Sequence, residues 1–318
     1  MHGSTGALAY PDLVIQLGQY PAPSHVIAHL SDTHLLSGGR PLYGQANTIE
    51  HLAAALAQLE ASNAHPEAIV FTGDLADLGE EDAYARLKQL VEPAAQRLNA
   101  RVIWVMGNHD ERLAYSRQLF GQESTEPQDR VYDIRGLRVV SFDTTVPGFH
   151  HGELSDEQLE WLAGVLSSPA PHGTILAMHH PPIPTPLLEA MGMLELKRQQ
   201  RLAAVLKGSD VIAILAGHLH YSTHSTFAGI PVSVASATCY TLDLSAGERL
   251  LSGVDFGQSM NLVHVYDDRV VHSIIPIGNA VEITGYPVEA WRQIESMTPE
   301  ERMAAYSSKT TNTDGGPL

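Results

Sequence analysis

The sequence has little cysteine and little positive charge, and each shortage excludes a class of protein. Cys239 is the only cysteine among 318 residues, so a disulfide framework is excluded and a reducing compartment is expected. Nineteen basic residues stand against 36 acidic ones, which gives a formal net charge of −17. A nucleic acid is therefore not the expected partner, although a small anion could still bind at a metal site.

Long apolar stretches are also missing. The longest aliphatic ones, such as residues 211–217, are far shorter than the ~20 residues that cross a bilayer, so no transmembrane segment is expected. The first basic residue is Arg40. This argues against a secretory signal, because such a signal begins with positive charge before an apolar core. Together these features predict a cytoplasmic protein.

Short apolar stretches alternate with amphipathic ones along most of the chain, which is typical of an α/β fold. Strands are expected at 26–30, 68–71, 102–106, 131–134, 137–142, 174–178 and 211–215, and again at 225–227, 231–234, 261–266 and 270–275. Helices are expected after the cap Asn47, over 80–98 with a bend or break at Pro93, after the capping pair Ser155 and Gln158, and over 194–206. This order predicts a four-layer α/β/β/α sandwich with two mixed β-sheets flanked by helices.

The chain divides by composition into three parts. Residues 1–24 are expected to form an N-terminal arm, residues 25–278 the main domain and residues 279–318 a C-terminal tail. In the tail, Thr298, Pro299 and Glu301 predict the start of one short helix. The last dozen residues have the composition of a disordered end.

Metal-binding side chains follow five of the expected strands. In chain order the polar residues at these positions are Asp32, His34, Asp74, Asp77, Asn108, His109, His179, His218 and His220. Ligands bind at the carboxyl ends of strands in open α/β sheets, so the five strand ends predict one shared site. A set of Asp, His and Asn without a thiolate suits Fe, Mn, Zn or Co better than Ca or Mg.

Two metal ions would need a bridging ligand. A carboxylate has two oxygens and can span ions ~3.5 to 4 Å apart, and Asp74, at the sharp turn after a strand, is the expected bridge. Two divalent ions with Asp32, Asp74 and a bridging hydroxide leave a net charge of about +1, which would attract a phosphodiester.

In this order the motifs D-x-H, G-D-x-x-D, G-N-H-D, H-H and G-H-x-H resemble those of the calcineurin-like metallophosphoesterase superfamily. Longer stretches, at 29–35, 69–77, 104–110, 174–184, 214–223 and 229–240, resemble the actinobacterial class III cyclic nucleotide phosphodiesterases. That similarity covers residues 25–278, whereas the arm, the tail and residues 241–258 match less well.

The resemblance implies two metal ions, often Fe and Mn in this family. The first would be held by Asp32, His34, Asp74 and His220, and the second by Asp74, Asn108, His179 and His218. His109 would be the general acid, oriented by Asp77. Substrate contacts would come from His34, Asp74, Asn108, His109 and His220, and the protein would be a homodimer.

The implied reaction is hydrolysis of 3′,5′-cyclic AMP, or of another cyclic nucleotide, to the nucleoside 5′-monophosphate by in-line attack of a metal-bridging hydroxide. A broader phosphodiesterase or a phosphomonoesterase remains an alternative, but protein phosphatases of the superfamily have D-R-G where this chain has Asp77-Leu78-Gly79. A nuclease fits the net charge poorly, and a non-catalytic scaffold is the alternative from another class. His150 either lines the cleft or lies on a solvated loop, and Cys239 is expected in the core.

Overall fold

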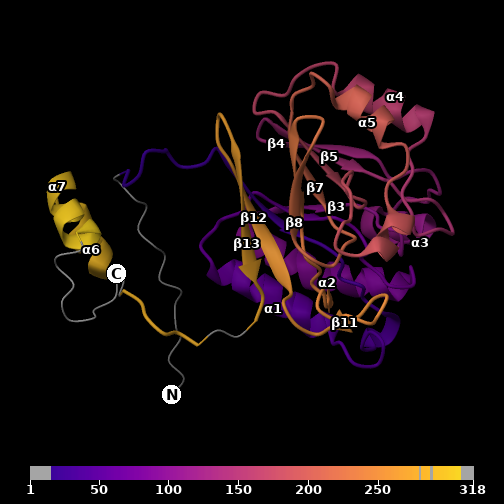
Figure 1. Ribbon diagram of the computed structural model, residues 1–318, viewed down its shortest axis with the longest axis horizontal. Coiled ribbons are helices and arrows are strands. Elements are labelled where there is room, and N and C mark those ends of the chain that lie inside the picture. The colour runs from indigo at the N-terminus through magenta and orange to yellow at the C-terminus, as the bar shows by residue number, and fades with distance from the viewer. Residues whose placement is uncertain (1–15, 279–280, 287–288, 309–318) are drawn as a thin grey trace. The chain divides into compact units, whose positions relative to one another are not determined.

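The computed structural model describes residues 16–278, 281–286 and 289–308 (Figure 1). Two compact units are distinguished along the chain, one of residues 23–278 and one of residues 1–22 with 279–318. Within the described ranges no helix is both long enough and apolar enough to cross a membrane. The expected arm over 1–15 and the end of the tail over 309–318 lie outside the described residues.

A five-stranded mixed sheet forms one half of the larger unit, in the order β13-β12-β1-β2-β3. Its strands are β1 (His25–Leu30), β2 (Ala68–Phe71), β3 (Arg101–Trp104), β12 (Ser259–Val265) and β13 (Val270–Pro276). β1, β2 and β3 run parallel, while β12 and β13 are antiparallel to their neighbours. The helices α1 (Thr48–Ala61), α2 (Glu81–Leu98) and α3 (Arg112–Phe120) pack on its outer face through one apolar cluster.

A six-stranded mixed sheet forms the other half, in the order β4-β5-β6-β7-β9-β8. Its strands are β4 (Arg130–Ile134), β5 (Leu137–Phe142), β6 (Thr174–Met178), β7 (Val211–Ala216), β8 (Thr223–Phe227) and β9 (Ile230–Val234). The helices α4 (Asp156–Val165) and α5 (Gln199–Leu206) and the 3-10 segment η2 (Glu189–Leu194) contribute side chains to the apolar cluster on its outer face.

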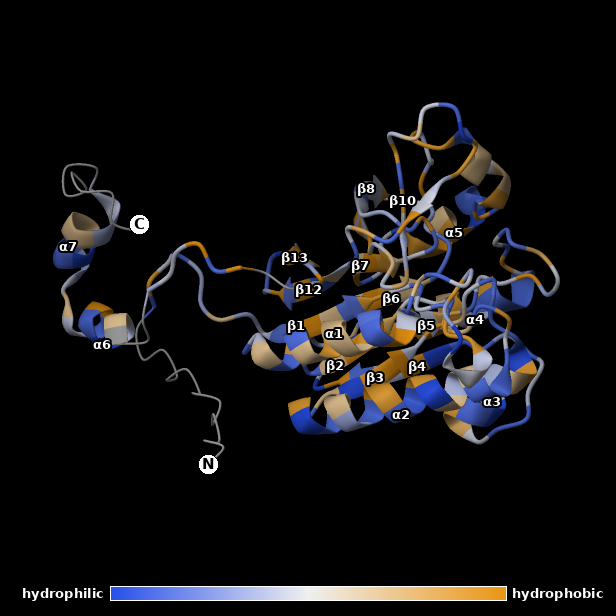
Figure 2. Cartoon of the chain, turned by 90° about the horizontal axis from the view of Figure 1, so that it is seen from below, coloured by the Kyte–Doolittle hydropathy of each residue, from blue (hydrophilic) through white to orange (hydrophobic). Residues whose placement is uncertain are grey.

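The two sheets face each other through a third apolar cluster. Along β2, Val70 points into this cluster, whereas Ile69 and Phe71 point to the helices. Both faces of the central strands are buried, which explains why their sequences are continuous apolar stretches. Figure 2 shows hydrophilic and hydrophobic patches alternating along α2. The predicted four-layer α/β/β/α sandwich is confirmed.

Short elements complete the described chain. They are η1 (Ser37–Gly39), the paired strands β10 (Thr241–Leu242) and β11 (Gly253–Val254), α6 (Glu289–Ser296), α7 (Pro299–Arg302) and the π-helical turn η3 (Met303–Ser307). The side chain of Thr298 accepts a hydrogen bond from the backbone of Glu301, so the capping box starts α7 as expected. The prediction of one helix in the tail was wrong, because α6 precedes α7.

Two helix predictions need correction. Leu194 ends the 3-10 segment η2, and residues 195–198 are not helical, because Gly152 forms backbone hydrogen bonds with Glu195 and Lys197 and Arg198 has a φ of 53°. The helix therefore begins only at Gln199. Pro93 does not interrupt α2. α2 buries apolar residues on both sides of the proline, and this packing offsets the missing hydrogen bond.

Candidate metal centre

The predicted ligands come from both sheets and meet at one edge of the sandwich. In the first sheet, β1, β2 and β3 end shortly before Asp32, Asp74 and Asn108. In the second sheet, β6 and β7 end directly or one residue before His179 and His218. All these strands run parallel to a neighbour, so their carboxyl ends lie at a common edge.

Several of these residues have a backbone conformation that residues other than glycine rarely adopt. The φ angle lies between 43° and 73° at Asp32, His34, Asp74, His218 and His220. A left-handed backbone costs about 1 to 3 kcal/mol for such residues, and they cluster at functional sites. The surrounding structure therefore holds these residues in a backbone conformation that they would not favour on their own. The sequence contained no signal of this strain.

Two glycines allow the ligand loops to approach one another. A Cβ atom on Gly107 would overlap the backbone nitrogen of Asp74. A Cβ atom on Gly217 would overlap the Ser31 side chain and lie 2.7 Å from Oδ2 of Asp32. Neither position can carry a side chain without displacing a carboxylate of the site.

The first group of predicted ligands consists of Asp32, His34, Asp74 and His220. Each offers one ligand atom, and these atoms lie within 4.8 Å of one another. Nε2 of His34 is 3.4 Å from Oδ2 of Asp74, and Nε2 of His220 is 3.4 Å from Oδ1 of Asp32. Nε2 of His34 is buried and has no hydrogen-bond partner among the described residues, so it is free to bind a metal ion.

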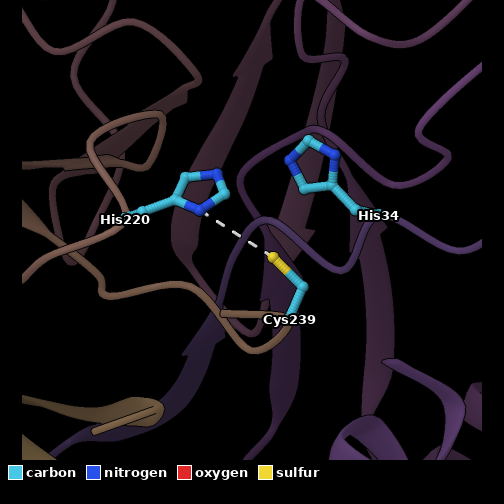
Figure 3. Close-up of side chains that lie close together, drawn as sticks. All are labelled: His34, His220 and Cys239. Atoms are coloured by element: carbon cyan, nitrogen blue, oxygen red, sulfur yellow. Dashed lines mark hydrogen bonds between the residues drawn. The ribbon is translucent and has the colours of Figure 1, made fainter. Parts of the chain in front are cut away.

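The other nitrogen of each imidazole is held by a further residue. Nδ1 of His34 donates to Oδ1 of Asp77 at 2.9 Å, and Nδ1 of His220 donates to the carbonyl oxygen of Tyr240 at 3.1 Å. Because Nδ1 is held as the donor, Nε2 is the nitrogen of each ring that faces the carboxylates and would bind a metal ion. Figure 3 shows the two rings beside Cys239, whose Sγ lies 3.9 Å from Nδ1 of His220.

The second group consists of Asp74, Asn108, His179 and His218. Nε2 of His179 lies 3.3 Å from Oδ2 of Asp74 and 3.0 Å from Oδ1 of Asn108. Nδ1 of His218 lies 3.2 Å from Nε2 of His179, whose own Nδ1 donates to the carbonyl of Thr72 at 2.7 Å. Nε2 of His179 thus lies close to Asp74, Asn108 and His218 alike, as a shared metal site would require.

Asp74 belongs to both groups. Its Oδ2 lies 3.4 Å from Nε2 of His34 and 3.3 Å from Nε2 of His179. Its Oδ1 accepts the backbone N–H of His109 at 2.9 Å, which fixes the carboxylate. A carboxylate held between two imidazole groups in this way can bridge a pair of metal ions.

The site contains two buried carboxylates, Asp32 and Asp74, whose negative charge must be balanced by positive charge. Burial raises the pKa of each carboxyl, but His179 and His34 together hold the pKa of Asp74 well below its usual value. His220 lowers the pKa of Asp32 to about 2 in the same way. Burial favours neutral His179, yet Asp74 raises its pKa to about 9. Protons or metal ions can balance the two carboxylates, and the oxygen and nitrogen donors suit divalent transition metals.

His109 and Asp77 lie next to the ligands. Nδ1 of His109 donates to the backbone carbonyl of Asp77 at 2.9 Å, while the Asp77 carboxylate is 3.6 Å away. That carboxylate accepts from His34 instead. Asp77 thus orients His109 through its main chain and a predicted metal ligand through its side chain, a division that the sequence did not indicate.

A cleft of about 260 Å³ opens over these residues. It is lined by every residue expected to contact substrate, namely His34, Asp74, Asn108, His109 and His220. It is also lined by residues without an assigned role, which are His150, Met191, Leu194, Tyr240, Leu242 and Leu251.

Of the additional lining residues, only His150 had a signal in the sequence, its place on a glycine-flanked loop. The structure places it in the cleft rather than away from it, with Nδ1 2.9 Å from Nδ2 of Asn108 and its ring 4.9 Å from that of His109. Nε2 of His180 hydrogen bonds to the carbonyl of His150 and supports that loop. The apolar residues had no signal, because loop leucines and methionines resemble core residues in a sequence.

Fold and site together define a metal-dependent phosphoesterase. The model of the calcineurin-like phosphoesterases matches residues 25–222, and the chain belongs to this family. It is 53% identical to a probable cyclic nucleotide phosphodiesterase of Rhodococcus erythropolis, over 87% of this chain and 91% of that protein. It is 52% identical to a cAMP/cGMP dual specificity phosphodiesterase of Mycobacterium tuberculosis, over 88% of this chain and 89% of that protein.

Solved structures share the fold at low sequence identity. A dimetal phosphatase from Danio rerio matches with a TM-score of 0.58 and 15% identity, over 80% of this chain and 96% of that one. A purple acid phosphatase from yellow lupin matches with a TM-score of 0.53 and 13% identity, over 80% of this chain and 52% of that one. These similarities support the architecture.

Proposed function

We propose that this protein hydrolyses 3′,5′-cyclic nucleotides, cyclic AMP among them, to nucleoside 5′-monophosphates with the help of two divalent metal ions. The proposal depends most on the position of Asp74. Its Oδ2 lies within 3.4 Å of Nε2 of His34, from the first group, and of Nε2 of His179, from the second group. This pair of groups lies beneath a cleft. The relatives at 52% and 53% identity, whose names describe cyclic nucleotide phosphodiesterases, support the choice of substrate.

Each ion has its own set of residues in this proposal. Asp32, His34, Asp74 and His220 hold the first ion, and Asp74, Asn108, His179 and His218 hold the second. Fe and Mn are the proposed occupants, with Zn or Co as alternatives for the same donor set. When bound, such ions supply a water of lowered pKa and positive charge for the phosphate oxygens.

His109 supplies the proton that the departing oxygen needs. Its Nδ1 is occupied by the carbonyl of Asp77, which leaves Nε2 to carry the second proton of an imidazolium into the cleft. As water oxygen bonds to phosphorus and the water gives up a proton to the solvent, the bond from phosphorus to O3′ breaks and Nε2 protonates O3′. His109 then takes up a proton from the solvent. The product is a 5′-monophosphate with a free 3′-hydroxyl group. The carbonyl of Asp77 accepts from the ring, and the Asp74 carboxylate accepts the backbone N–H of His109, so both keep His109 in place.

Phosphate monoesters are the competing substrate class within the same chemistry. The chain has Leu78 where protein phosphatases of the superfamily have an arginine for the phosphate, and Leu78 is exposed to solvent. This favours a diester of lower charge. We also propose a cytoplasmic homodimer, based on the sequence resemblance and on the single reduced Cys239. Light scattering of the purified protein measures the dimer.

One assay tests the proposed function. The purified protein is stripped with a chelator, reloaded with Mn²⁺ or Fe²⁺ and given 3′,5′-cyclic AMP, 3′,5′-cyclic GMP, 2′,3′-cyclic AMP and p-nitrophenyl phosphate. We expect the 3′,5′-cyclic nucleotides to be converted to 5′-monophosphates, and Asn108→Ala to lose most of this turnover. Preference for p-nitrophenyl phosphate over every cyclic nucleotide would reject the proposal.

A further inference from the structure

The cleft has an apolar part next to its predicted metal ligands. Met191, Leu194, Tyr240, Leu242 and Leu251 line this part, and we call them the apolar wall. Met191 and Leu194 belong to η2, whereas the other three belong to the segment around the β10 and β11 pair. Two segments that supply no predicted metal ligand therefore form one continuous surface with the metal centre.

The apolar wall is fixed to the metal centre. The Tyr240 ring lies 4.5 Å from the ring of His220, and the backbone N–H of Leu242 donates to the carbonyl of His220 at 3.3 Å. A Cβ atom on Gly253 would lie 2.9 Å from the Tyr240 ring, so the β11 backbone packs directly against that ring. Met191 is only 5% exposed and is part of the core cluster beneath the cleft. The wall is thus preorganised.

The apolar wall offers little hydrogen bonding to a ligand. Four of its five members have aliphatic or thioether side chains. The fifth, Tyr240, is hydrogen bonded to Tyr43 and has its ring 5.8 Å from the Tyr43 ring. A ligand held here is recognised through apolar and aromatic surface.

We propose that the apolar wall is the subsite for the base of the cyclic nucleotide, an inference that rests on the proposed function. With the phosphate at the metal ions, the rest of a small diester must lie along the cleft, and a purine presents flat aromatic faces to such a wall. Adenine and guanine differ in the hydrogen-bonding groups at their edges. The apolar wall has no free side-chain hydrogen-bond partner for these edge groups, so it should discriminate only weakly between adenine and guanine.

The test compares two adjacent leucines, one that lines the cleft and one that does not. Leu251 lines the cleft and is 43% exposed, whereas Leu250 does not line it and is 74% exposed, so Leu250→Ala is the matched control for Leu251→Ala. Both positions are exposed enough for the variants to fold. Each Mn²⁺-loaded variant is assayed with cyclic AMP, cyclic GMP and the cyclic phosphate of 1,3-propanediol, which has the same six-membered diester ring but no base.

We expect Leu251→Ala to raise KM for both cyclic nucleotides roughly three- to tenfold with little change in kcat, because the lost contact is made equally in the bound and transition states. It should leave kcat/KM for the base-free diester unchanged, and Leu250→Ala should resemble the wild type throughout. The wild-type kcat/KM values for cyclic AMP and cyclic GMP should agree within about tenfold.

Two results would overturn the base subsite while the proposed function stands. One is Leu251→Ala with wild-type KM values in an enzyme that hydrolyses cyclic AMP. The other is a ratio of kcat/KM values for cyclic AMP and cyclic GMP, in either direction, above about 100-fold. Such a ratio would require hydrogen bonds between the protein and the edge of the base. A wild-type enzyme that hydrolyses the base-free diester but no cyclic nucleotide would instead overturn the proposed function.

Discussion

At the scale of single residues, His109 is the side chain whose removal separates proton transfer from the rest of the reaction. His109→Ala should lower kcat for cyclic AMP by about 10²- to 10⁴-fold, because the alkoxide then leaves without a proton. The loss should be much smaller for bis-p-nitrophenyl phosphate, since p-nitrophenolate is a stable anion. Steady-state kinetics with both substrates and with the exposed His65→Ala as control measure the difference. Equal losses for the two substrates would contradict a general acid.

Residue types at the strand ends were enough to predict which side chains meet. Their chemistry is visible in the sequence because Asp, His and Asn interrupt apolar stretches. The orientation of these side chains cannot be predicted from the sequence. The positive φ of Asp74 and the hydrogen bond from His34 to the Asp77 carboxylate depend on how separate loops pack.

At the scale of elements, the loops after β2 and β3 depend on Gly107. Gly107→Ala should lower both bound metal and activity at least tenfold, because the new methyl group would displace Asp74. Gly164→Ala, in α4, is the matched control. It has open space around its Cβ position and a helical backbone, so it should retain activity and gain about 0.4 to 1 kcal/mol of stability. Metal analysis by mass spectrometry and thermal unfolding measure both variants. Full metal content in Gly107→Ala would contradict the close-packed site.

Elements were predictable where local signals and packing agree. The strands β2, β6 and β7 are apolar on both faces, and caps such as Ser155 formed as expected. The segment before α5 has a helical composition, but its backbone pairs with Gly152, a contact that no local pattern reveals. The helices α3 and α6 lacked a sufficient pattern and were missed.

At the scale of the whole molecule, the space between the sheets contains a polar interior residue that should make the protein acid-sensitive. Nε2 of His29 donates to Oγ1 of Thr72 at 2.9 Å, while its Nδ1 is buried without a partner among the described residues. Burial lowers the pKa of His29 to about 3, below the usual value of about 6.5 in an unfolded chain. The unfolded state therefore binds the extra proton, and stability is lost as the pH falls from 6.5 toward 3.

This linkage predicts how a variant responds to pH. Between pH 7 and 5 the wild type should lose about 2 kcal/mol through His29, and His29→Gln should lack that part of the loss. Urea unfolding in the presence of a chelator measures it, with the exposed His65→Gln as control. Identical pH dependence in the wild type and His29→Gln would refute the assignment.

Metal ions at the proposed sites would join the two sheets. Asp32 and Asp74 belong to loops of the first sheet, whereas His179, His218 and His220 belong to loops of the second. Chelation should therefore lower Tm by several degrees and readdition of Mn²⁺ should restore it, because ligand binding to the folded state alone stabilises it. Differential scanning calorimetry measures the shift. Asp74→Asn should reduce it, and an unchanged Tm after complete metal removal would contradict ions held between the sheets.

The segments that form the apolar wall supply none of the residues proposed to hold the ions. The residues proposed to cleave the phosphodiester and those proposed to bind the base are thereby encoded in separate stretches of the gene. Descendants of this chain could acquire new substrates through changes in η2 and the segment around β10 and β11, while the ion-binding loops stayed as they are.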